Sequence, residues 1–455
     1  RYDQIISSHQ QIQLYMKYNL IDFPDDILNE LLKILKPPTI VSFTGHMIDK
    51  PERVNSRFPS YIEEAVRKAI EKKLDDLEVK IGFSSAACGA DIIFLESMLD
   101  RGAEVNVVLP FNLDDFIQTS VKFAGPKWIT RFNKVIKLAN SVKYVTKERY
   151  LGHDSLFDYS GKVINGYAYL RANNLLTSPH LLAVMDPDTD RLIGGAASIV
   201  DKWPNKELCH IINIRDLHRN QNEYSPKLVQ LKNTSKQVKK EIIHSISKKR
   251  EIFTMLFADI VGYSKLKEVD YPHFYDFLKE VAEQLKEFSS YSKFINTWGD
   301  AIFTVMDKAI PLIEYAFALN HAVNNADHIK LKLPDKMNIR IALHAGPAFE
   351  IKDPITSRNN VYGSHVNRAA RIEPVTLPGH IYASEQFVAQ LVSEQVEYEY
   401  EAIKKNKPVK CIFALEYVGS MKLHKDFGMQ SVYHIRKRTE HEGELFSKKI
   451  SRNRS

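Results

Sequence analysis

Residues 256–264, Leu256-Phe257-Ala258-Asp259-Ile260-Val261-Gly262-Tyr263-Ser264, form an apolar run that ends in an aspartate and a glycine. The apolar residues before Asp259 predict a buried strand, and the pattern that follows predicts a helix over about 265–286. A strand that brings a carboxylate to its end, beside a glycine that lets backbone N–H groups approach a ligand, can hold a metal ion and phosphates together. We therefore expect the rest of the chain to serve or control this stretch.

A second aspartate follows in residues 296–303, Asn296-Thr297-Trp298-Gly299-Asp300-Ala301-Ile302-Phe303. Apolar strands flank Gly299-Asp300, which predicts a hairpin with Asp300 at its tip. By itself such a tip is an ordinary turn. Because Asp259 also lies at a strand end, the two carboxylates can meet across a sheet and bind two divalent cations.

A third candidate element lies further along, where Asn367 and Arg371 are spaced i, i+4 on a predicted helix. An amide that fixes a ribose and a guanidinium that neutralises a phosphate would share one face of that helix. The alternative is an ordinary surface pair. His344, His365 and His424 show no metal-ligand spacing, and we expect structural roles for them.

These elements together resemble the class III nucleotidyl cyclase (adenylate/guanylate cyclase) catalytic domain over residues 251–435. The matching landmarks are residues 257–264, Gly299-Asp300, 339–347, 362–371, Pro378-Gly379 and the segment around 425–427. The resemblance implies an α+β domain with a ferredoxin-like core at residues 251–436. It also implies an enzyme that converts a nucleoside triphosphate into a 3′,5′-cyclic nucleoside monophosphate and pyrophosphate.

By the same resemblance, two Mg²⁺ or Mn²⁺ ions per site are bound by Asp259, Asp300 and the backbone carbonyl of Ile260. One ion would lower the pKa of the ribose 3′-hydroxyl and the other would hold the triphosphate. Asn367 would orient the ribose, and Arg371 would stabilise charge on the α-phosphate. The expected phosphate contacts are the backbone N–H groups of Val261, Gly262 and Tyr263 and the side chain of Lys425. Since the family's metal aspartates and Asn/Arg pair come from opposite protomers, a homodimer with shared active sites is implied.

The resemblance leaves the base open at Asn296 and Asn360. Adenylate cyclases of the family carry Lys and Asp at the matching positions, and guanylate cyclases carry Glu and Cys. An amide offers both a donor and an acceptor, so neither purine pattern is satisfied. A pyrimidine (uridylate or cytidylate) cyclase of a bacterial anti-phage signalling system is one alternative. A non-catalytic nucleotide-sensing dimerisation module is another, although it would have no chemical need for all four polar residues of the site.

The first part of the chain has a different pattern. Residues 1–38 predict an amphipathic helical segment that ends at Pro37-Pro38. Residues 39–216 alternate short apolar strands with helices, which predicts an α/β domain with a parallel sheet covered on both faces. The expected strands are 39–44, 79–84, 104–109, 141–145, 180–185 and 208–214, and the expected helices are 61–77, 91–101, 126–139, 161–175 and 194–202.

Two turns of this region are candidate ligand sites, with Gly45 in one and Cys88, Gly89 and Asp91 in the other. Small residues at a strand-to-helix turn leave room for a phosphate or nucleotide, although tight turns in any α/β domain also need them. The turn at 84–91, with residues 92–96 and the strand 105–109, resembles the SLOG superfamily of nucleotide-ligand sensor domains. This implies a Rossmann-like sensor for a nucleotide-derived ligand that regulates the cyclase domain. No GxGxxG fingerprint is present, so we expect no conventional dinucleotide site.

Residues 217–250 are expected to be a linker helix, and residues 437–455 a basic flexible tail. The 455 residues are 44% hydrophobic and 26% charged, as in a globular protein of two or three domains. The net charge of +7 is mild and local, so we expect no nucleic-acid partner.

The three cysteines, Cys88, Cys209 and Cys411, lie far apart and suggest free thiols in a reducing compartment. No apolar run approaches the roughly 18 residues that a membrane helix needs. With no signal peptide visible, we expect a cytoplasmic protein without a membrane partner.

Overall fold

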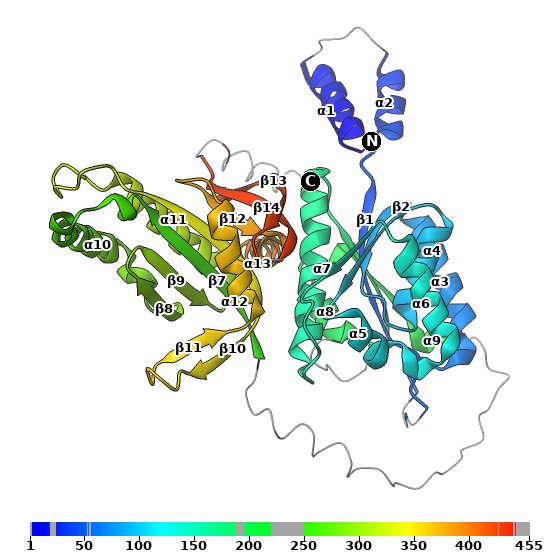
Figure 1. The fold of residues 1–455 in the computed structure, drawn as a ribbon. Coiled ribbons are helices and arrows are strands. Elements are labelled where there is room, and N and C mark those ends of the chain that lie inside the picture. Colours follow the sequence, from blue (N-terminus) through cyan, green and yellow to red (C-terminus); the bar gives the residue numbers. More distant parts are fainter. Residues whose placement is uncertain are drawn as a thin grey trace. The chain divides into compact units, whose positions relative to one another are not determined.

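The computed structural model describes residues 2–18, 24–51, 53, 56–187, 195–219, 250–425, 427–439 and 442. The chain divides into two units, Arg1–Thr234 and Ser235–Ser455. Most of the expected linker helix at 217–250 and most of the expected tail at 437–455 lie outside the described residues. Each unit is considered by itself (Figure 1).

The first unit is built on a parallel sheet of six strands in the order β4-β3-β2-β1-β5-β6. All the predicted strands of this region are present within one residue of their expected bounds: β1 Thr39–Gly45, β2 Val79–Ser84, β3 Glu104–Leu109, β4 Ser141–Tyr144, β5 His180–Met185 and β6 Cys209–Asn213. The four inner strands, β1, β2, β3 and β5, are largely buried, as expected for a parallel sheet with both faces covered, and the edge strands β4 and β6 are only partly buried. The predicted α/β fold is confirmed.

Helices cover both faces of this sheet, with α7 and α8 on one side and α3, α4 and α6 on the other (Figure 1). The helices of the unit are α1 Tyr2–Tyr18, α2 Asp25–Ile34, α3 Glu63–Asp76, α4 Ala90–Asp100, α5 Leu113–Ser120, α6 Pro126–Leu138, α7 Ser155–Asn174, α8 Ala196–Lys202 and α9 Ile214–Arg219. α7 begins six residues before the expected start at Gly161, which lies inside the helix. A Cβ at Gly161 would lie 2.8 Å from Ile199 Cδ1, so this glycine allows α7 and α8 to pack closely.

The second unit contains a mostly antiparallel sheet in the order β13-β14-β12-β10-β7-β9-β8, with β11 paired to β10. Among the described strands of this second sheet, only β10 and β12 pair in parallel. The strands are β7 Arg250–Val261, β8 Ser292–Trp298, β9 Ala301–Met306, β10 Asn338–Lys352, β11 Asn359–Tyr362, β12 Ile381–Ser384, β13 Phe413–Leu423 and β14 Gly428–Lys437. The predicted α+β fold of this part is present.

Among the described residues, four helices accompany the second sheet: α10 Tyr271–Leu285, α11 Ala309–Asn325, α12 Ser364–Ile372 and α13 Glu385–Lys404. The expected helix from residue 265 is corrected, because short 3-10 turns occupy 263–265 and 268–270 and α10 begins at Tyr271. Pro272 lies in the first turn of α10, where its missing N–H breaks no helical hydrogen bond.

The face of the sheet that carries α12 also carries Asp259. Ala369 of α12 packs in one buried cluster with Phe253 and Met255 of β7. Alternate residues of a strand point to the same face, so Asp259 points to the α12 side as well. None of the described helices is long and apolar enough to cross a membrane.

Candidate active site

Asp259 lies near the end of β7, a strand flanked by β9 and β10. Its direct cross-strand neighbours are Ala301 on β9 and Arg340 on β10. Gly299 and Asp300 form the turn between β8 and β9, as predicted, and Gly299 has a φ of 65°, which favours glycine. The Ile260 N–H donates to the Asp300 carbonyl oxygen at 3.1 Å, which ties this turn to β7.

The carboxyl groups of Asp259 and Asp300 lie beside one another. The pKa of Asp300 is raised, first because burial disfavours its charged form and then because Asp259 adds negative charge and a side-chain hydrogen bond. A divalent cation between the two groups would relieve this repulsion. Within the described ranges, no group of three or more His, Cys, Asp or Glu side chains is arranged to hold a metal ion. The pair and nearby carbonyl oxygens are oxygen donors, the ligand type that Mg²⁺ and Mn²⁺ prefer, and so they fit such an ion.

The glycine after the strand, Gly262, has a left-handed backbone conformation. Gly262 has a φ of 105° and begins the 3-10 turn at Tyr263–Lys265. The Tyr263 ring contacts Tyr271 and Phe274, and its hydroxyl lies 3.3 Å from where a Cβ of Gly299 would be. The loop expected to bind phosphates is therefore packed against the hairpin that carries Asp300.

Helix α12 presents Asn367 and Arg371 one turn apart. Asn367 is exposed, and Arg371 is partly buried, with a buried Nε that has no hydrogen-bond partner among the described residues. A buried donor without a partner is costly, and a ligand oxygen would satisfy it. In the part of the chain that the structure describes, no hydrogen bond or ion pair joins Asn367 or Arg371 to Asp259 or Asp300.

Three further predicted site residues lie elsewhere on the sheet. Lys425 is exposed in the turn between β13 and β14, and β12 and β10 separate β14 from β7. Asn296 is partly buried on β8, paired with Phe303. Asn360 lies on β11, which contacts β8.

The Asn360 amide has a fixed orientation. Tyr362 donates its hydroxyl hydrogen to Asp353, so the Tyr362 oxygen accepts from Asn360 Nδ2 at 2.9 Å. The Val361 N–H donates to Asn360 Oδ1 at 2.8 Å. One N–H and one lone pair of the amide remain for a ligand.

Arg340 and Glu373 were not singled out from the sequence, although both adjoin the carboxylate pair. Arg340 Nη2 donates to Asp259 Oδ2 at 2.6 Å, and its Nε lies 2.8 Å from Glu373 Oε1. The pKa of Glu373 is raised by burial first, opposed by Arg340, and raised further by Asp259 and Asp300. The antiparallel register of β7 and β10, which the sequence alone did not give, is the signal that identifies Arg340.

The two histidines expected to be structural touch each other under α12. His344 Nε2 and His365 Nδ1 are 2.8 Å apart, and His344 Nδ1 lies 2.7 Å from Ser384 Oγ. Burial lowers the pKa of His344 well below its usual value and that of His365 to about 3, so both rings are neutral at ordinary pH. Sequence spacing did not reveal this contact.

Residues 246–416 match the family described as the adenylate and guanylate cyclase catalytic domain. The matched part of the chain is called the cyclase domain below. The resemblance predicted over residues 251–435 is thereby confirmed for most of that range.

The cyclase domain also has curated relatives. It is 32% identical over 143 residues to a Rhizobium meliloti protein whose name assigns it as adenylate cyclase 3. An adenylate cyclase of Neurospora crassa is 30% identical over 84 residues. These matches cover 30% and 17% of this chain, but the chain spans only 23% and 4% of the relatives' lengths.

Among solved structures, the cyclase domain is similar to the guanylate cyclase domain of RhGC from Catenaria anguillulae in complex with GTP. That match has 22% identity and a TM-score of 0.31, and it covers 42% of this chain and 98% of the other. The adenylyl cyclase CyaB from P. aeruginosa matches with 16% identity and a TM-score of 0.33, covering 43% and 98% of the two chains.

Outside the cyclase domain, the two candidate ligand turns of the first unit pack against each other. The Ala90 N–H donates to the His46 carbonyl at 3.1 Å, and the Cys88 N–H to the Ser120 carbonyl at 2.9 Å. A Cβ at Gly45 would lie 2.4 Å from Ala90 Cβ, and one at Gly89 would lie 2.6 Å from the Ile48 nitrogen. Close packing of the chain on itself thus requires these glycines, whether or not a ligand binds there.

Asp91 and Cys88 in the same turn are buried. Burial raises the pKa of Asp91 to about 7, although the Ala87 N–H donates to its carboxyl group. Burial also raises the pKa of the Cys88 thiol to about 12, so it is not a reactive thiolate. The proposed ligand role of this turn stays a prediction.

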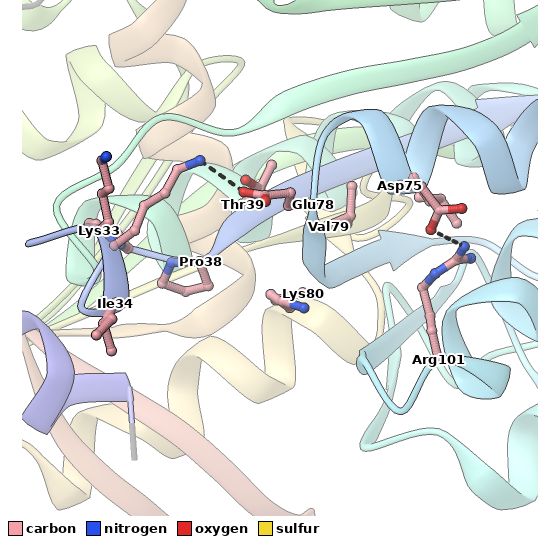
Figure 2. A pocket seen from close by; sticks show the side chains of 12 residues that line it. Lys33, Ile34, Pro38, Thr39, Asp75, Glu78, Val79, Lys80 and Arg101 are labelled. Carbon is pink, nitrogen blue, oxygen red and sulfur yellow. Dashed lines mark hydrogen bonds and ion pairs between the residues drawn. The ribbon is translucent and has the colours of Figure 1, made fainter. Parts of the chain in front are cut away.

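A cavity of about 450 Å³ lies at the opposite, amino-terminal ends of β1 and β2 (Figure 2). α2 supplies Lys33 to its lining, and Lys36 follows that helix. Lys36 pairs with Glu78 at 3.0 Å, and Arg101 pairs with Asp75 at 2.6 Å. These ion pairs neutralise part of the positive charge of the cavity.

Proposed function

We propose that this protein is a class III nucleotidyl cyclase that converts a nucleoside triphosphate into a 3′,5′-cyclic nucleoside monophosphate and pyrophosphate. The observation that carries the proposal is the convergence of the Asp259 and Asp300 carboxylates within a cyclase catalytic domain. Such a pair fits the divalent cations that phosphoryl transfer requires.

In this proposal Asp259, Asp300 and the Ile260 carbonyl hold two Mg²⁺ or Mn²⁺ ions. When bound, these ions would make the ribose 3′-hydroxyl more acidic and neutralise the triphosphate. The backbone around Gly262, directly before the turn at Tyr263–Lys265, binds the phosphates, with Lys425 as a further contact.

The chain's other polar groups act on the ribose and the α-phosphate. Asn367 orients the ribose so that its 3′-oxygen faces the α-phosphorus. Arg371 donates hydrogen bonds to the α-phosphate oxygens as negative charge grows on them. A bond from O3′ to phosphorus forms, the bond to the β-phosphate oxygen breaks, and pyrophosphate and the hydroxyl proton leave.

We further propose that the active protein is a homodimer with two shared sites. The absence of a described contact between the Asp259–Asp300 pair and Asn367 or Arg371 in one chain supports this arrangement. In the dimer, α12 of one protomer would complete the site of the other. The first unit would regulate dimer geometry in response to a nucleotide-derived ligand.

The two asparagines at the expected base-recognition positions suggest which nucleobase the substrate carries. Asn296 and Asn360 stand where the purine patterns have Lys and Asp or Glu and Cys, which supports a pyrimidine substrate as the second candidate. The amide of Asn360, held by Tyr362, offers one donor and one acceptor. Cytosine and uracil each present a donor beside an acceptor that such an amide can pair with, as do the Watson–Crick edges of adenine and guanine, so the pyrimidine proposal is carried by the departure from the purine patterns.

A product assay tests the proposal. The full chain is incubated with ATP, GTP, CTP or UTP and Mn²⁺ or Mg²⁺, and the products are identified by mass spectrometry. We expect a cyclic mononucleotide from at least one of them. Asp300→Ala should abolish it, and Asp307→Ala, at the other end of β9, is the matched control. No cyclic product from any nucleotide with a verified dimer would favour the sensing module instead.

Complementation tests the shared site. Arg371→Ala should lower kcat roughly a hundredfold, as when one transition-state donor is removed. Mixing Asp300→Ala with Arg371→Ala subunits should restore one intact site per heterodimer. If the mixture stays as inactive as its components, the shared-site arrangement is wrong.

A further inference from the structure

Arg340 holds two carboxylates that belong to different parts of the cyclase domain. It lies directly opposite Asp259 in the pairing of β7 with β10, and Nη2 donates to Asp259 Oδ2 at 2.6 Å. On its other side, Nε lies 2.8 Å from Glu373 Oε1. Arg340 and Asp259 are 30% and 28% exposed, and Glu373 is 15% exposed, so solvent only partly screens these contacts.

The two contacts are not equivalent. The Asp259 contact is a hydrogen bond, whereas the Glu373 contact is an ion pair without hydrogen-bond alignment, since Arg340 Nε and Glu373 Oε1 have no hydrogen-bond partner among the described residues. A small rotation of the guanidinium would align the second contact as the first weakens. The guanidinium is a rigid fork, so moving one of its nitrogen atoms moves the others.

Glu373 is joined firmly to the helix that carries Arg371. It directly follows α12 and begins the 3-10 turn at Glu373–Val375. The preceding Ile372 is completely buried, and its carbonyl accepts a hydrogen bond from Thr376 Oγ1 at 2.9 Å. A force on the Glu373 side chain therefore acts on the end of α12, two residues from Arg371.

The charges around Arg340 predict how its two contacts would change when a cation binds at Asp259. Asp259, Asp300 and Glu373 surround one guanidinium, which leaves an excess of negative charge. A cation at Asp259 would repel Arg340 and compete for the same carboxylate oxygen. Arg340 would then interact more strongly with Glu373.

We propose that Arg340 is a positioning residue that couples the two active sites of the dimer. The inference rests on the proposed function, in which Asp259 and Arg371 of one subunit serve different sites. A metal ion held by Asp259 in one site would then alter, through Arg340 and Glu373, the helix that completes the other site.

The first test measures metal binding without turnover. Mn²⁺ is titrated into the full-length protein without nucleotide, and free Mn²⁺ is followed by electron paramagnetic resonance. In Glu373→Gln the side chain of Arg340 has only Asp259 as a charged partner and competes more strongly with Mn²⁺ for it. The Mn²⁺ affinity should therefore fall by about 5-fold, which corresponds to the largest energies found for partly exposed ion pairs. Glu401→Gln, on an exposed part of α13, is the matched control.

A double-mutant cycle shows whether Glu373 acts through Arg340. In the Arg340→Gln background, Glu373→Gln should change Mn²⁺ affinity by less than about 2-fold, because the intermediary is gone. An unchanged loss there, as large as in the parent background, would overturn the proposal. Arg340→Lys, which keeps the charge without the fork, is the second variant if Arg340→Gln unfolds, as judged by thermal unfolding without metal.

The second test uses the complementing heterodimer. Its intact site takes Asp259 and Asp300 from the Arg371→Ala subunit and α12 from the Asp300→Ala subunit. Arg340→Lys is placed only in the Asp300→Ala subunit, whose own Asp259 is outside the intact site. Coupling predicts a several-fold lower kcat with an unchanged Mn²⁺ requirement.

Two outcomes of the heterodimer experiment distinguish a failure of the coupling from a failure of the shared site. Full activity with that placement would show that Arg340 does not position α12 for the other site, and the proposal would be wrong. If the heterodimer without any change at Arg340 is inactive, the shared site of the proposed function has failed. The Mn²⁺ titration then still decides whether Arg340 links Glu373 to Asp259.

Discussion

At the scale of single residues, the candidate site consists of two carboxylates and one guanidinium whose positions are set by the pairing of neighbouring strands. Asp259 and Asp300 are brought together at a strand end and a hairpin tip, and Arg340 partly offsets their charge. Repulsion between the carboxylates is a cost that the fold bears, as is usual where function requires like charges together. Removing one of them should therefore have opposite effects on activity and stability.

Asp300→Asn should abolish cyclase activity and stabilise the second unit at pH 7–8. The folded-state pKa of Asp300 is raised, so the folded form binds the proton more tightly than the unfolded form. Its contribution to stability is thus most favourable at low pH and declines as the pH rises through the folded pKa. The gain should be below about 1 kcal/mol, because the group is partly exposed.

Thermal unfolding at pH 5 and pH 8 checks this prediction, with Asp307→Asn as the control. The Asp300→Asn variant should gain more at pH 8 than at pH 5. Equal or lower stability at both pH values would show that Asp259 and Asp300 do not repel each other in the folded protein.

At the scale of elements, the placement of α12 depends on the ring of His365 fitting over Gly346 of β10. A Cβ at Gly346 would lie 2.1 Å from His365 Nδ1, closer than any real contact. The ring also hydrogen-bonds to His344, which contacts Ser384 at the start of α13. This buried polar chain fixes the distance between α12 and the sheet, and with it the position of Arg371.

Gly346→Ala should therefore destabilise the second unit by about 1–3 kcal/mol, as overpacking does. It should also lower kcat, since α12 must shift. Denaturant unfolding and kinetics of the full chain measure both effects.

The matched variant for this prediction is Gly346→Ala combined with His365→Ala, which removes the clashing ring. The double variant should be destabilised by clearly less than the sum of the two single changes. Strict additivity would mean that the ring and the glycine do not constrain each other.

At the scale of the whole molecule, the chain divides into two compact units, each with its own buried residues. Buried Asp91 lies in the first unit, at the turn between β2 and α4. Its pKa is raised from 3.8 to about 7 by burial, which makes the stability of that unit depend on pH. His46 has its pKa lowered to about 4, first by burial, and contributes with the opposite sign.

Asp91→Asn should stabilise the first unit at pH 8 by about 2–4 kcal/mol and have little effect near pH 4. The raised folded pKa means that the contribution of Asp91 is present below pH 4 and is lost as the pH rises toward 7 and beyond. The His46 contribution is the same in both proteins and cancels in the difference. Calorimetry of the full chain at several pH values follows the transition of each unit.

Only the transition of the first unit should respond in this measurement. Asp100→Asn, at the far end of α4, serves as the control. A difference between Asp91→Asn and the parent that does not change between pH 4 and pH 8 would contradict a raised pKa.

The sequence by itself determined the order of the helices and strands and the residue types at the strand ends and turns that form the candidate site. Apolar runs flanked by turn residues predicted the six parallel strands, and the hairpin at Gly299-Asp300 followed from its flanking strands. The motif residues carried the cyclase resemblance, because they combine a particular residue type with a fixed spacing. Local patterns of this kind can be recognised from the sequence because strand alternation, helix periodicity and turn conformation depend on near neighbours in the chain.

Only the tertiary structure decided which distant groups touch. It placed Arg340 between Asp259 and Glu373, and it stacked His365 on His344. It also packed the Gly45 and Gly89 turns against each other, although their small residues had suggested space for a ligand. These contacts join segments up to 81 residues apart, and they depend on strand register and side-chain packing. No local pattern in the sequence encodes them, because their energy arises only when the segments meet.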